Sequence, residues 1–192
     1  IGIEASLTGH LVFATLHTNS APESVIRLLD MGMDPFNFAD ALLGILAQRL
    51  AKRLCPKCKE AYHPDAAEMQ HFLAEYCEEL QATSTFRQDA KAAAEALYQR
   101  WLKEYGQGGK LTLYRPKGCE ACSNTGYKGR VGLHELLVGN DAVKRLIQEH
   151  ARVAELLAQA LEDGMCTLKQ DGMEKVLQGI TDMKQVRAVC IK

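Results

Sequence analysis

Four of the chain's cysteines form two pairs with the same internal spacing. Cys55 and Cys58 stand in the stretch "CPKC", and Cys119 and Cys122 stand in "CEAC" much further along the chain. A single pair of this kind is ambiguous, since it is also typical of a redox dithiol and can arise by chance. Two pairs, each beside Gly, Pro or Asn residues that permit a tight turn, favour a tetrahedral zinc site with four thiolate ligands.

The energetics of such a zinc site are favourable. Closing the long loop between the pairs costs on the order of 4 kcal/mol of chain entropy, whereas a structural zinc site supplies roughly 10–16 kcal/mol at neutral pH. Four sulfurs leave no open coordination position, so we expect a structural metal. His63 and His71 are alternative ligands near the first pair, and the remaining thiols, Cys77, Cys166 and Cys190, are expected to pack on helices.

The stretch "LTGHLVFATLHTN" holds a second candidate for chemistry. Residues 10–16 are rich in β formers and predict a short buried strand, with His10 and His17 at its two ends. Polar residues at the carboxyl end of a buried strand are where α/β proteins place groups that contact a ligand, although a core strand with ordinary polar ends fits equally. No carboxylate pair, Ser-His-Asp order or dinucleotide fingerprint supports another chemistry.

The composition is that of an ordinary globular protein, with 47% hydrophobic and 24% charged residues. A formal net charge of −1 gives no global attraction to nucleic acid or anionic lipid. No apolar run approaches the roughly 20 residues of a membrane helix, so no transmembrane segment is expected. With no export signal, a reducing cytoplasm is the expected location. Because "IGIEASL" reads like the middle of a helix without a cap, we expect a longer parent protein.

The elements before the first cysteine pair are predicted to be mostly helical. Ser20 is the expected cap of a helix that ends near Gly32. Asp34 is the expected cap of a second helix over residues 36–50. Cations at the end of this second helix suit its dipole, and they are Arg49, Lys52 and Arg53.

The remaining elements surround the second cysteine pair. Residues 59–118 are predicted to form an insertion of two helices rich in Ala and Glu, followed by a short strand in "KLTLYRP". A further strand is predicted over 130–138. Four helices are predicted after it, over residues 141–149, 152–163, 169–178 and 182–188.

Four stretches in this order carry a resemblance to a known family. They are "LTGHLVFATLHTNSAPESVIRLLDMGMDPF", "LAQRLAKRLCPKC", "GCEACSNTGYKGRVGLHELL" and "DGMCTLKQDGMEKVLQGIT". Together they resemble the C-terminal part of secretion traffic ATPases, the hexameric motors of type II secretion and type IV pilus assembly. The resemblance covers nearly all of the chain except residues 59–118. Because the tetracysteine module is typical of assembly and secretion motors and generally missing from retraction motors, it favours an assembly or export motor.

The resemblance implies an α/β fold: the C-terminal portion of a RecA-like ATPase domain, with an inserted tetracysteine zinc-binding helical module and a helical C-terminal subdomain. The implied division is 1–54 for the partial ATPase core, 55–122 for the zinc module with its helical insertion, and 123–192 for the closing strand and C-terminal helices. The parent would bind ATP and Mg, act as a homo-hexamer, and work in the cytoplasm, held at the inner membrane by platform proteins of the secretion or pilus machine.

The resemblance also assigns roles to single residues. His17 matches the family's histidine box near the nucleotide γ-phosphate, and His10 is a weaker candidate for contact with the nucleotide or a neighbouring subunit. Arg49 and Arg53 match a basic segment that can couple nucleotide state to neighbouring subunits, although a surface role at the helix end fits equally. Two further residues match a stretch that borders the nucleotide site, with a strand-edge ion pair as the alternative interpretation: Arg130 and Glu135.

The chain departs from the family where phosphate is held. The phosphate loop GxxxxGK[ST], the acidic box and the Walker B segment do not occur in it. Without the loop's N–H groups and lysine, the β- and γ-phosphates are not held. We therefore expect ATPase activity in the parent and none in this chain alone.

Two other classes of function stay open at this point. A zinc-stapled adaptor that binds proteins without nucleotide is one, because "CEACSNTGYKGR" resembles chaperone-type zinc repeats; the unexplained histidine stretch argues against it. Nucleic-acid binding is disfavoured, since only Lys117, Lys128 and Arg130 cluster near the second pair. The insertion 59–118 is either a partner surface, for example for the platform proteins, or a solvated helical hairpin.

Overall fold

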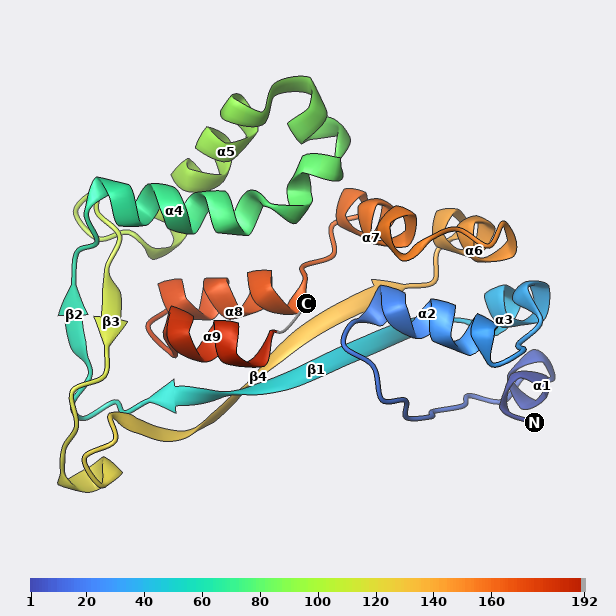
Figure 1. The fold of residues 1–192 in the computed structure, drawn as a ribbon, viewed down its shortest axis with the longest axis horizontal. Coiled ribbons are helices and arrows are strands. Elements are labelled where there is room, and N and C mark those ends of the chain that lie inside the picture. Colours follow the sequence, from blue (N-terminus) through green and yellow to red (C-terminus); the bar gives the residue numbers. More distant parts are fainter. Residues whose placement is uncertain (191–192) are drawn as a thin grey trace. The chain divides into compact units, whose positions relative to one another are not determined.

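The computed structural model describes residues 1–190, which divide into two units (Figure 1). Unit 1 consists of Ile1–Ala47 and Glu135–Thr167. Unit 2 consists of Gln48–His134 and the residues from Leu168 onward. The division into 1–54, 55–122 and 123–192 stays a prediction.

Unit 1 is a small bundle of helices on the ends of two strands. Its core is buried and apolar, with Val25, Phe38, Leu137, Ile147 and Leu156 at its centre. Helix α2 packs against α7, and α3 packs against both α1 and α6. The helices are α1 (Gly2–Leu7), α2 (Ala21–Asp30), α3 (Pro35–Ala41), α6 (Asp141–Gln148) and α7 (Val153–Glu162).

The helix starts of unit 1 confirm the predicted caps. The Ser20 hydroxyl accepts the Glu23 amide at 3.3 Å, and the Asp34 carboxylate accepts the Asn37 amide at 2.8 Å. Each bond satisfies an amide that has no partner within the first turn of its helix. The end of α2 confirms the predicted stop as well, since Gly32 follows it with a φ of +88°.

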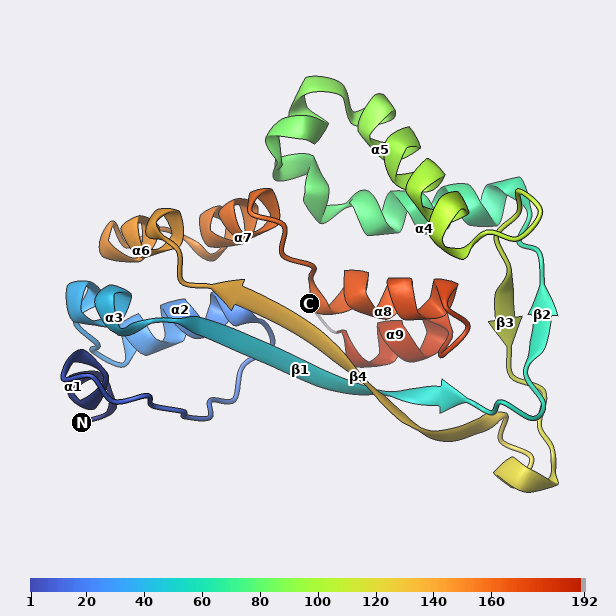
Figure 2. The same cartoon turned by 180° about the vertical axis from the view of Figure 1, so that it is seen from behind.

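Strands β1 (Gly44–Leu54) and β4 (Tyr127–Val138) pair with each other and run in opposite directions (Figures 1 and 2). The predicted helix over residues 36–50 is therefore wrong after Ala41, where α3 ends. Leucines at 43, 46, 50 and 54 follow a helical spacing, but side-chain burial in β1 alternates with a period of two. Pairing with a strand far along the chain outweighs the local helical preference.

This correction changes the meaning of the basic residues. Arg49, Lys52 and Arg53 lie along strand β1, not at the end of a helix. The interpretation of their charges as partners of a helix dipole is therefore wrong. The side chain of Arg49 is half-buried, whereas those of Lys52 and Arg53 are exposed.

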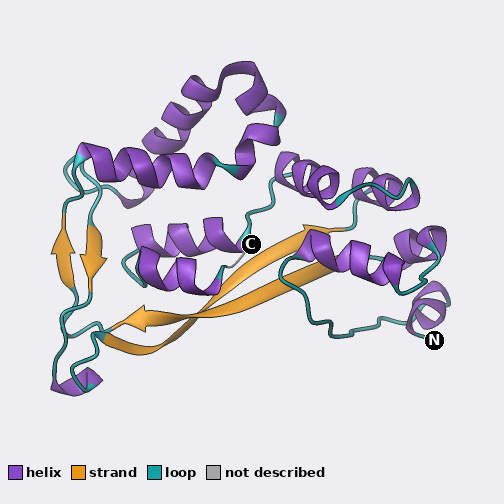
Figure 3. Cartoon of the chain, viewed as in Figure 1, coloured by secondary structure: helices purple, strands orange, loops and turns teal. Residues whose placement is uncertain are grey.

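The predicted buried strand over residues 10–16 is also wrong. The segment is a loop between α1 and α2 (Figure 3), and its apolar side chains are exposed, with Phe13 at 89%. A buried strand needs neighbouring strands for its backbone hydrogen bonds. Within residues 1–190, the sheets contain β1 with β4 and β2 with β3, and neither includes this segment.

Unit 2 confirms the predicted insertion of two helices and a strand. Strand β2 (Glu60–Tyr62) pairs antiparallel with β3 (Leu113–Arg115), with Glu60 opposite Arg115. No helix within residues 1–190 is both long and apolar enough to cross a membrane. The other elements of the unit are α4 (Ala66–Cys77), η1 (Glu79–Ala82), α5 (Ser84–Tyr105), η2 (Glu120–Cys122), α8 (Leu168–Leu177) and α9 (Met183–Val189).

The insertion helices pack into the core of unit 2 around the chain's single tryptophan. Trp101 is fully buried and meets the rings of Phe72 and Tyr76 edge-on, at centroid distances of 5.5 and 5.0 Å. Its indole N–H also donates to Glu174 of α8 at 3.3 Å. Three more donors reach the same carboxylate, so Glu174 ties the hairpin to α8; they are Tyr76, Arg100 and Tyr105.

A second carboxylate joins α4 to the C-terminal helices. The Arg187 guanidinium contacts both oxygens of Glu75, at 3.1 and 2.6 Å, and the Lys169 ammonium lies 2.9 Å from one of them. The hydrogen bonds from Arg187, opposed by burial and assisted by Lys169, lower the pKa of Glu75 from 4.5 to about 2.

We predict that Glu75→Gln makes unit 2 less stable at neutral pH but not in strong acid. Because the folded-state pKa is lowered, Glu75 contributes stability above its ordinary value of 4.5, and this contribution is lost as the pH falls toward about 2. The expected cost at neutral pH is about 1–2 kcal/mol, since exposure of Arg187 weakens the pair. Urea unfolding followed by Trp101 fluorescence measures it. Glu149→Gln, in unit 1, should have no effect, and a loss independent of pH would contradict the prediction.

Candidate functional site

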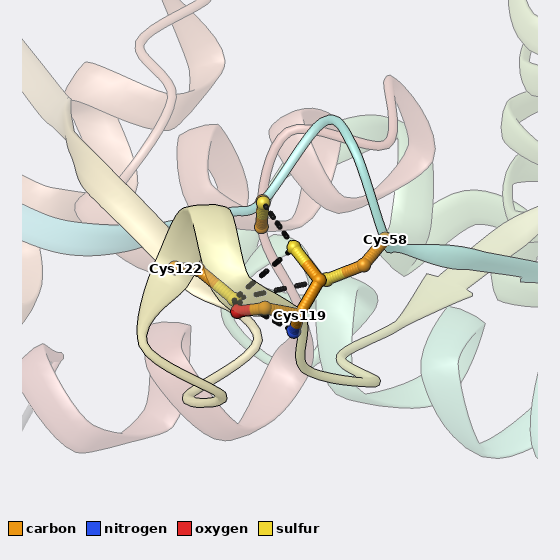
Figure 4. A group of neighbouring side chains, drawn as sticks. Cys58, Cys119 and Cys122 are labelled. Atoms are coloured by element: carbon orange, nitrogen blue, oxygen red, sulfur yellow. Dashed lines mark hydrogen bonds between the residues drawn. The ribbon is translucent and has the colours of Figure 1, made fainter.

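The four paired cysteines come together in unit 2, and we call them the tetracysteine cluster: Cys55, Cys58, Cys119 and Cys122. Their sulfurs all lie within 4.8 Å of one another, and Figure 4 shows the labelled side chains converging. The Cys55–Cys119, Cys58–Cys122 and Cys119–Cys122 sulfur distances are 3.9, 3.8 and 3.7 Å. A tetrahedral zinc with Zn–S bonds of about 2.3 Å requires sulfurs about 3.8 Å apart. The cluster therefore has the size that a zinc ion needs.

Each cysteine pair is presented by a tight turn. After β1 ends at Leu54, the Cys58 and Lys59 amides donate to the Cys55 carbonyl, at 3.3 and 3.0 Å. The second turn is built differently, from the short helix η2 followed by Ser123 and Asn124 in the left-handed region. Small polar residues tolerate that backbone conformation better than most. The predicted turns are confirmed.

Backbone amides point at the sulfurs and favour their ionised form. The Gly118 amide donates to Cys58 at 3.3 Å, and the Cys119 and Gly126 amides donate to Cys122 at 3.2 and 3.3 Å. Burial raises the pKa of Cys122, but the hydrogen bonds from these two amides, together with those from the Cys119 and Cys58 thiols, outweigh it and bring the pKa down to about 6. Burial and the neighbouring thiols raise the pKa of Cys58 to about 11. The Cys122 thiolate therefore forms readily. A divalent cation would offset the repulsion among four thiolates held this close together.

The other candidate ligands lie outside the cluster. His63 has its Nδ1 atom 3.1 Å from the Leu111 carbonyl oxygen, and His71 is exposed on α4. Within residues 1–190 no other group of three or more ligand-type side chains comes as close together as the four cysteines. The donor set is thus four sulfurs, and it leaves no position open for a substrate.

The residues that the resemblance assigns to the nucleotide site or to subunit coupling do not all belong to one unit. His10, His17 and Glu135 are in unit 1. His17 is exposed just before α2, and the His10 Nδ1 atom lies 3.2 Å from the Ala5 carbonyl oxygen. The other candidates belong to unit 2: Arg49, Arg53 and Arg130.

Glu135 is almost fully buried, with 3% of its surface exposed, and accepts the Ala21 amide at 2.7 Å. Ala21 is the first residue of α2, so a carboxylate on β4 caps this helix alongside Ser20. The Thr18 and Ser24 hydroxyls share a hydrogen bond of 2.5 Å. The sequence did not predict the contact between Glu135 and the Ala21 amide, because Glu135 is far from α2 along the chain and no local pattern connects them.

Comparison with known proteins shows the family of the chain. The chain belongs to the type II/IV secretion system protein family, whose model matches residues 1–188.

Curated relatives include secretion and pilus ATPases. The chain is 41% identical over 192 residues to the type IV pilus assembly ATPase PilB of Thermus thermophilus, covering all of this chain and 18% of that protein. It is 41% identical over 187 residues to the type II secretion system protein E of Dickeya dadantii, covering 97% and 30%. With the type II secretion system ATPase E of Vibrio cholerae it shares 40% over 189 residues, covering 98% and 31%. The chain thus spans less than a third of each relative.

We predict that Gly126→Ala weakens metal binding by roughly 10–100-fold, the range typical of groups that support metal ligands. Gly126 donates to the Cys122 sulfur, has a φ of +79°, and an added Cβ would lie 2.5 Å from the Cβ of Pro116. Gly129 is the matched control, because it has the same φ and open space around it. Competition with a chelator measures the affinity. Equal losses in Gly126→Ala and Gly129→Ala would show that only backbone strain matters.

Proposed function

We propose that the chain is the C-terminal part of a motor ATPase that uses ATP hydrolysis to drive pilus or pseudopilus assembly for protein secretion. The observation that carries this proposal is the family match over residues 1–188. The names of the relatives supply the activity: a type IV pilus assembly ATPase and a type II secretion system ATPase. Identity of about 40% along nearly the whole chain supports a common role for this part of the protein.

In this proposal the chain contributes to a RecA-like ATPase core, and the longer parent binds ATP and Mg. The phosphate loop would be supplied by residues outside this chain. His17 would face the γ-phosphate, and its exposure in the loop before α2 leaves it accessible. The parent would assemble as a homo-hexamer at the cytoplasmic side of the inner membrane, where it would meet the platform proteins.

The tetracysteine cluster is proposed to hold one structural zinc ion. The sulfur distances of 3.7–3.9 Å and the N–H groups aimed at Cys58 and Cys122 support this assignment. Bound zinc would supply positive charge that stabilises the thiolates, with no open position for catalysis. Cys55 and Cys58 would then join the end of β1 to the segment before β4.

We predict a single zinc ion per chain by elemental analysis of the purified protein. The double variant Cys119→Ser with Cys122→Ser should lose the zinc and unfold at a markedly lower temperature, because binding energy at such a site is folding energy. Cys166→Ser is the control, since Cys166 is exposed and outside the cluster. A folded chain without zinc, or with zinc retained in the double variant, would contradict the assignment.

We predict that this chain alone does not hydrolyse ATP, and that His17→Ala in the longer parent greatly lowers kcat. An assay of phosphate release measures the activity of the isolated chain and of the parent. The matched control is His71→Ala in the parent, which should leave kcat unchanged, because His71 is an exposed histidine on α4 in unit 2. Turnover by the isolated chain that is abolished by His17→Ala would refute the first part. A parent with no turnover at all would favour a zinc-stapled adaptor instead.

A further inference from the structure

A short turn joins helices α8 and α9 in unit 2, and we call its residues 179–182 the α8–α9 turn. It begins where α8 closes: Gly179 has a φ of +71°, and the Ile180 amide donates back to the Lys175 carbonyl at 3.0 Å. This is a common way for a helix to end. The turn finishes at Asp182, whose carboxylate caps α9. Both ends of the turn are therefore fixed by the helices that it joins.

Two residues of the α8–α9 turn bind strand β1 just before the first cysteine pair. The Leu54 amide donates to the Ile180 carbonyl at 2.9 Å, and the Thr181 hydroxyl donates to the Lys52 carbonyl at 2.8 Å. Thr181 and Leu54 are both buried, so water does not compete for these bonds. Because Cys55 follows directly, the two bonds fix the backbone that leads into the cluster.

The α8–α9 turn also binds the residue that follows the first cysteine pair. The Lys59 ammonium donates to the Gly179 carbonyl at 2.6 Å and lies over the Tyr114 ring, 4.3 Å from its centroid. An added Cβ at Gly179 would lie 2.6 Å from the Cε2 atom of Tyr114, so this close approach requires glycine. Lys59 comes directly after Cys58. The first cysteine turn is thus held on both sides.

The last residue of the α8–α9 turn binds the chain beside the second cysteine pair. The Tyr127 hydroxyl donates to the Asp182 carboxylate at 2.6 Å. Tyr127 follows Gly126, whose amide donates to the Cys122 sulfur at 3.3 Å and whose carbonyl accepts the Cys55 amide at 2.9 Å. Four consecutive residues therefore contact the chain next to both cysteine turns.

We infer that the α8–α9 turn positions the two cysteine turns, so that metal binding by the tetracysteine cluster and the docking of α8 and α9 on β1 strengthen each other. Ligands that are held in place before the metal arrives lose less conformational entropy when they bind it. The coupling is reciprocal, so a bound metal holds the α8–α9 turn more firmly in return. This inference rests on the proposed zinc site and adds a conformational consequence to it.

The affinity of the full chain for zinc, measured by competition with a chelator, tests the inference. Tyr127→Phe and Thr181→Val each remove one hydroxyl that holds the α8–α9 turn, without changing the charge near the thiolates. Each should weaken zinc binding by about five- to tenfold, the equivalent of one hydrogen bond.

The matched control is Tyr105→Phe, which should leave the zinc affinity unchanged. Its hydroxyl also donates to a carboxylate at 2.6 Å, but that carboxylate is Glu174 within α8, outside the α8–α9 turn. Trp101 fluorescence checks that each variant is folded. A loss of zinc affinity in Tyr105→Phe equal to that in Tyr127→Phe would overturn the inference, because metal binding would then be coupled to the folding of unit 2 as a whole.

Amide hydrogen exchange gives a second measurement, which a purely structural role of the turn would not affect. Removal of zinc should speed exchange at the Leu54 amide, which donates to Ile180 of the α8–α9 turn. The Ser24 amide, which donates to the Ser20 carbonyl in unit 1, should exchange at the same rate with and without zinc.

The outcomes separate this inference from the zinc assignment on which it rests. Zinc binding that is the same in the wild-type chain, Tyr127→Phe and Thr181→Val would overturn the inference and leave the zinc site intact. Exchange at Leu54 that does not respond to zinc would do the same. A wild-type chain that binds no zinc would overturn the zinc site and this inference together.

Discussion

The pairing of β1 with β4 is the constraint on which the position of the tetracysteine cluster depends. It joins residues far apart in the sequence, and it positions the cysteines because Cys55 follows β1 directly and Cys122 lies shortly before β4. The Cys55 amide donates to the Gly126 carbonyl at 2.9 Å, which extends the pairing into the cluster. Such non-local pairing carries a large entropy cost. A metal bound by the tetracysteine cluster, at the end of β1 and the start of β4, would offset this cost.

The insertion between the cysteine pairs belongs to the core of unit 2. Its helices bury Phe72, Tyr76 and Trp101, and its polar contacts converge on the carboxylates of Glu75 and Glu174. Removing one partner from a half-buried carboxylate of this kind leaves charge without compensation, which is costly. These carboxylates fix how the hairpin meets α8 and α9, while the aromatic rings of Phe72, Tyr76 and Trp101 lie in the buried core.

The two units divide the chemistry of the chain. Unit 1 carries the exposed histidine loop, whose junction with α2 is held by Ser20 and the buried Glu135. Unit 2 carries the tetracysteine cluster.

The sequence by itself determined the features that rest on local chemistry. A serine or aspartate before a helix satisfies that helix's own amides, so Ser20 and Asp34 were predictable as caps. Each CxxC turn likewise presents its two sulfurs whatever residues lie between the two pairs. The family could be inferred from four sequence stretches that occur in the family's order.

Tertiary structure alone decided the rest. Leucine spacing in residues 43–54 fits a helix, and only pairing with β4 makes the segment a strand. Contacts such as Glu135 with Ala21 and Glu174 with Trp101 join residues too distant for any local pattern, because their partners meet only after the chain has folded.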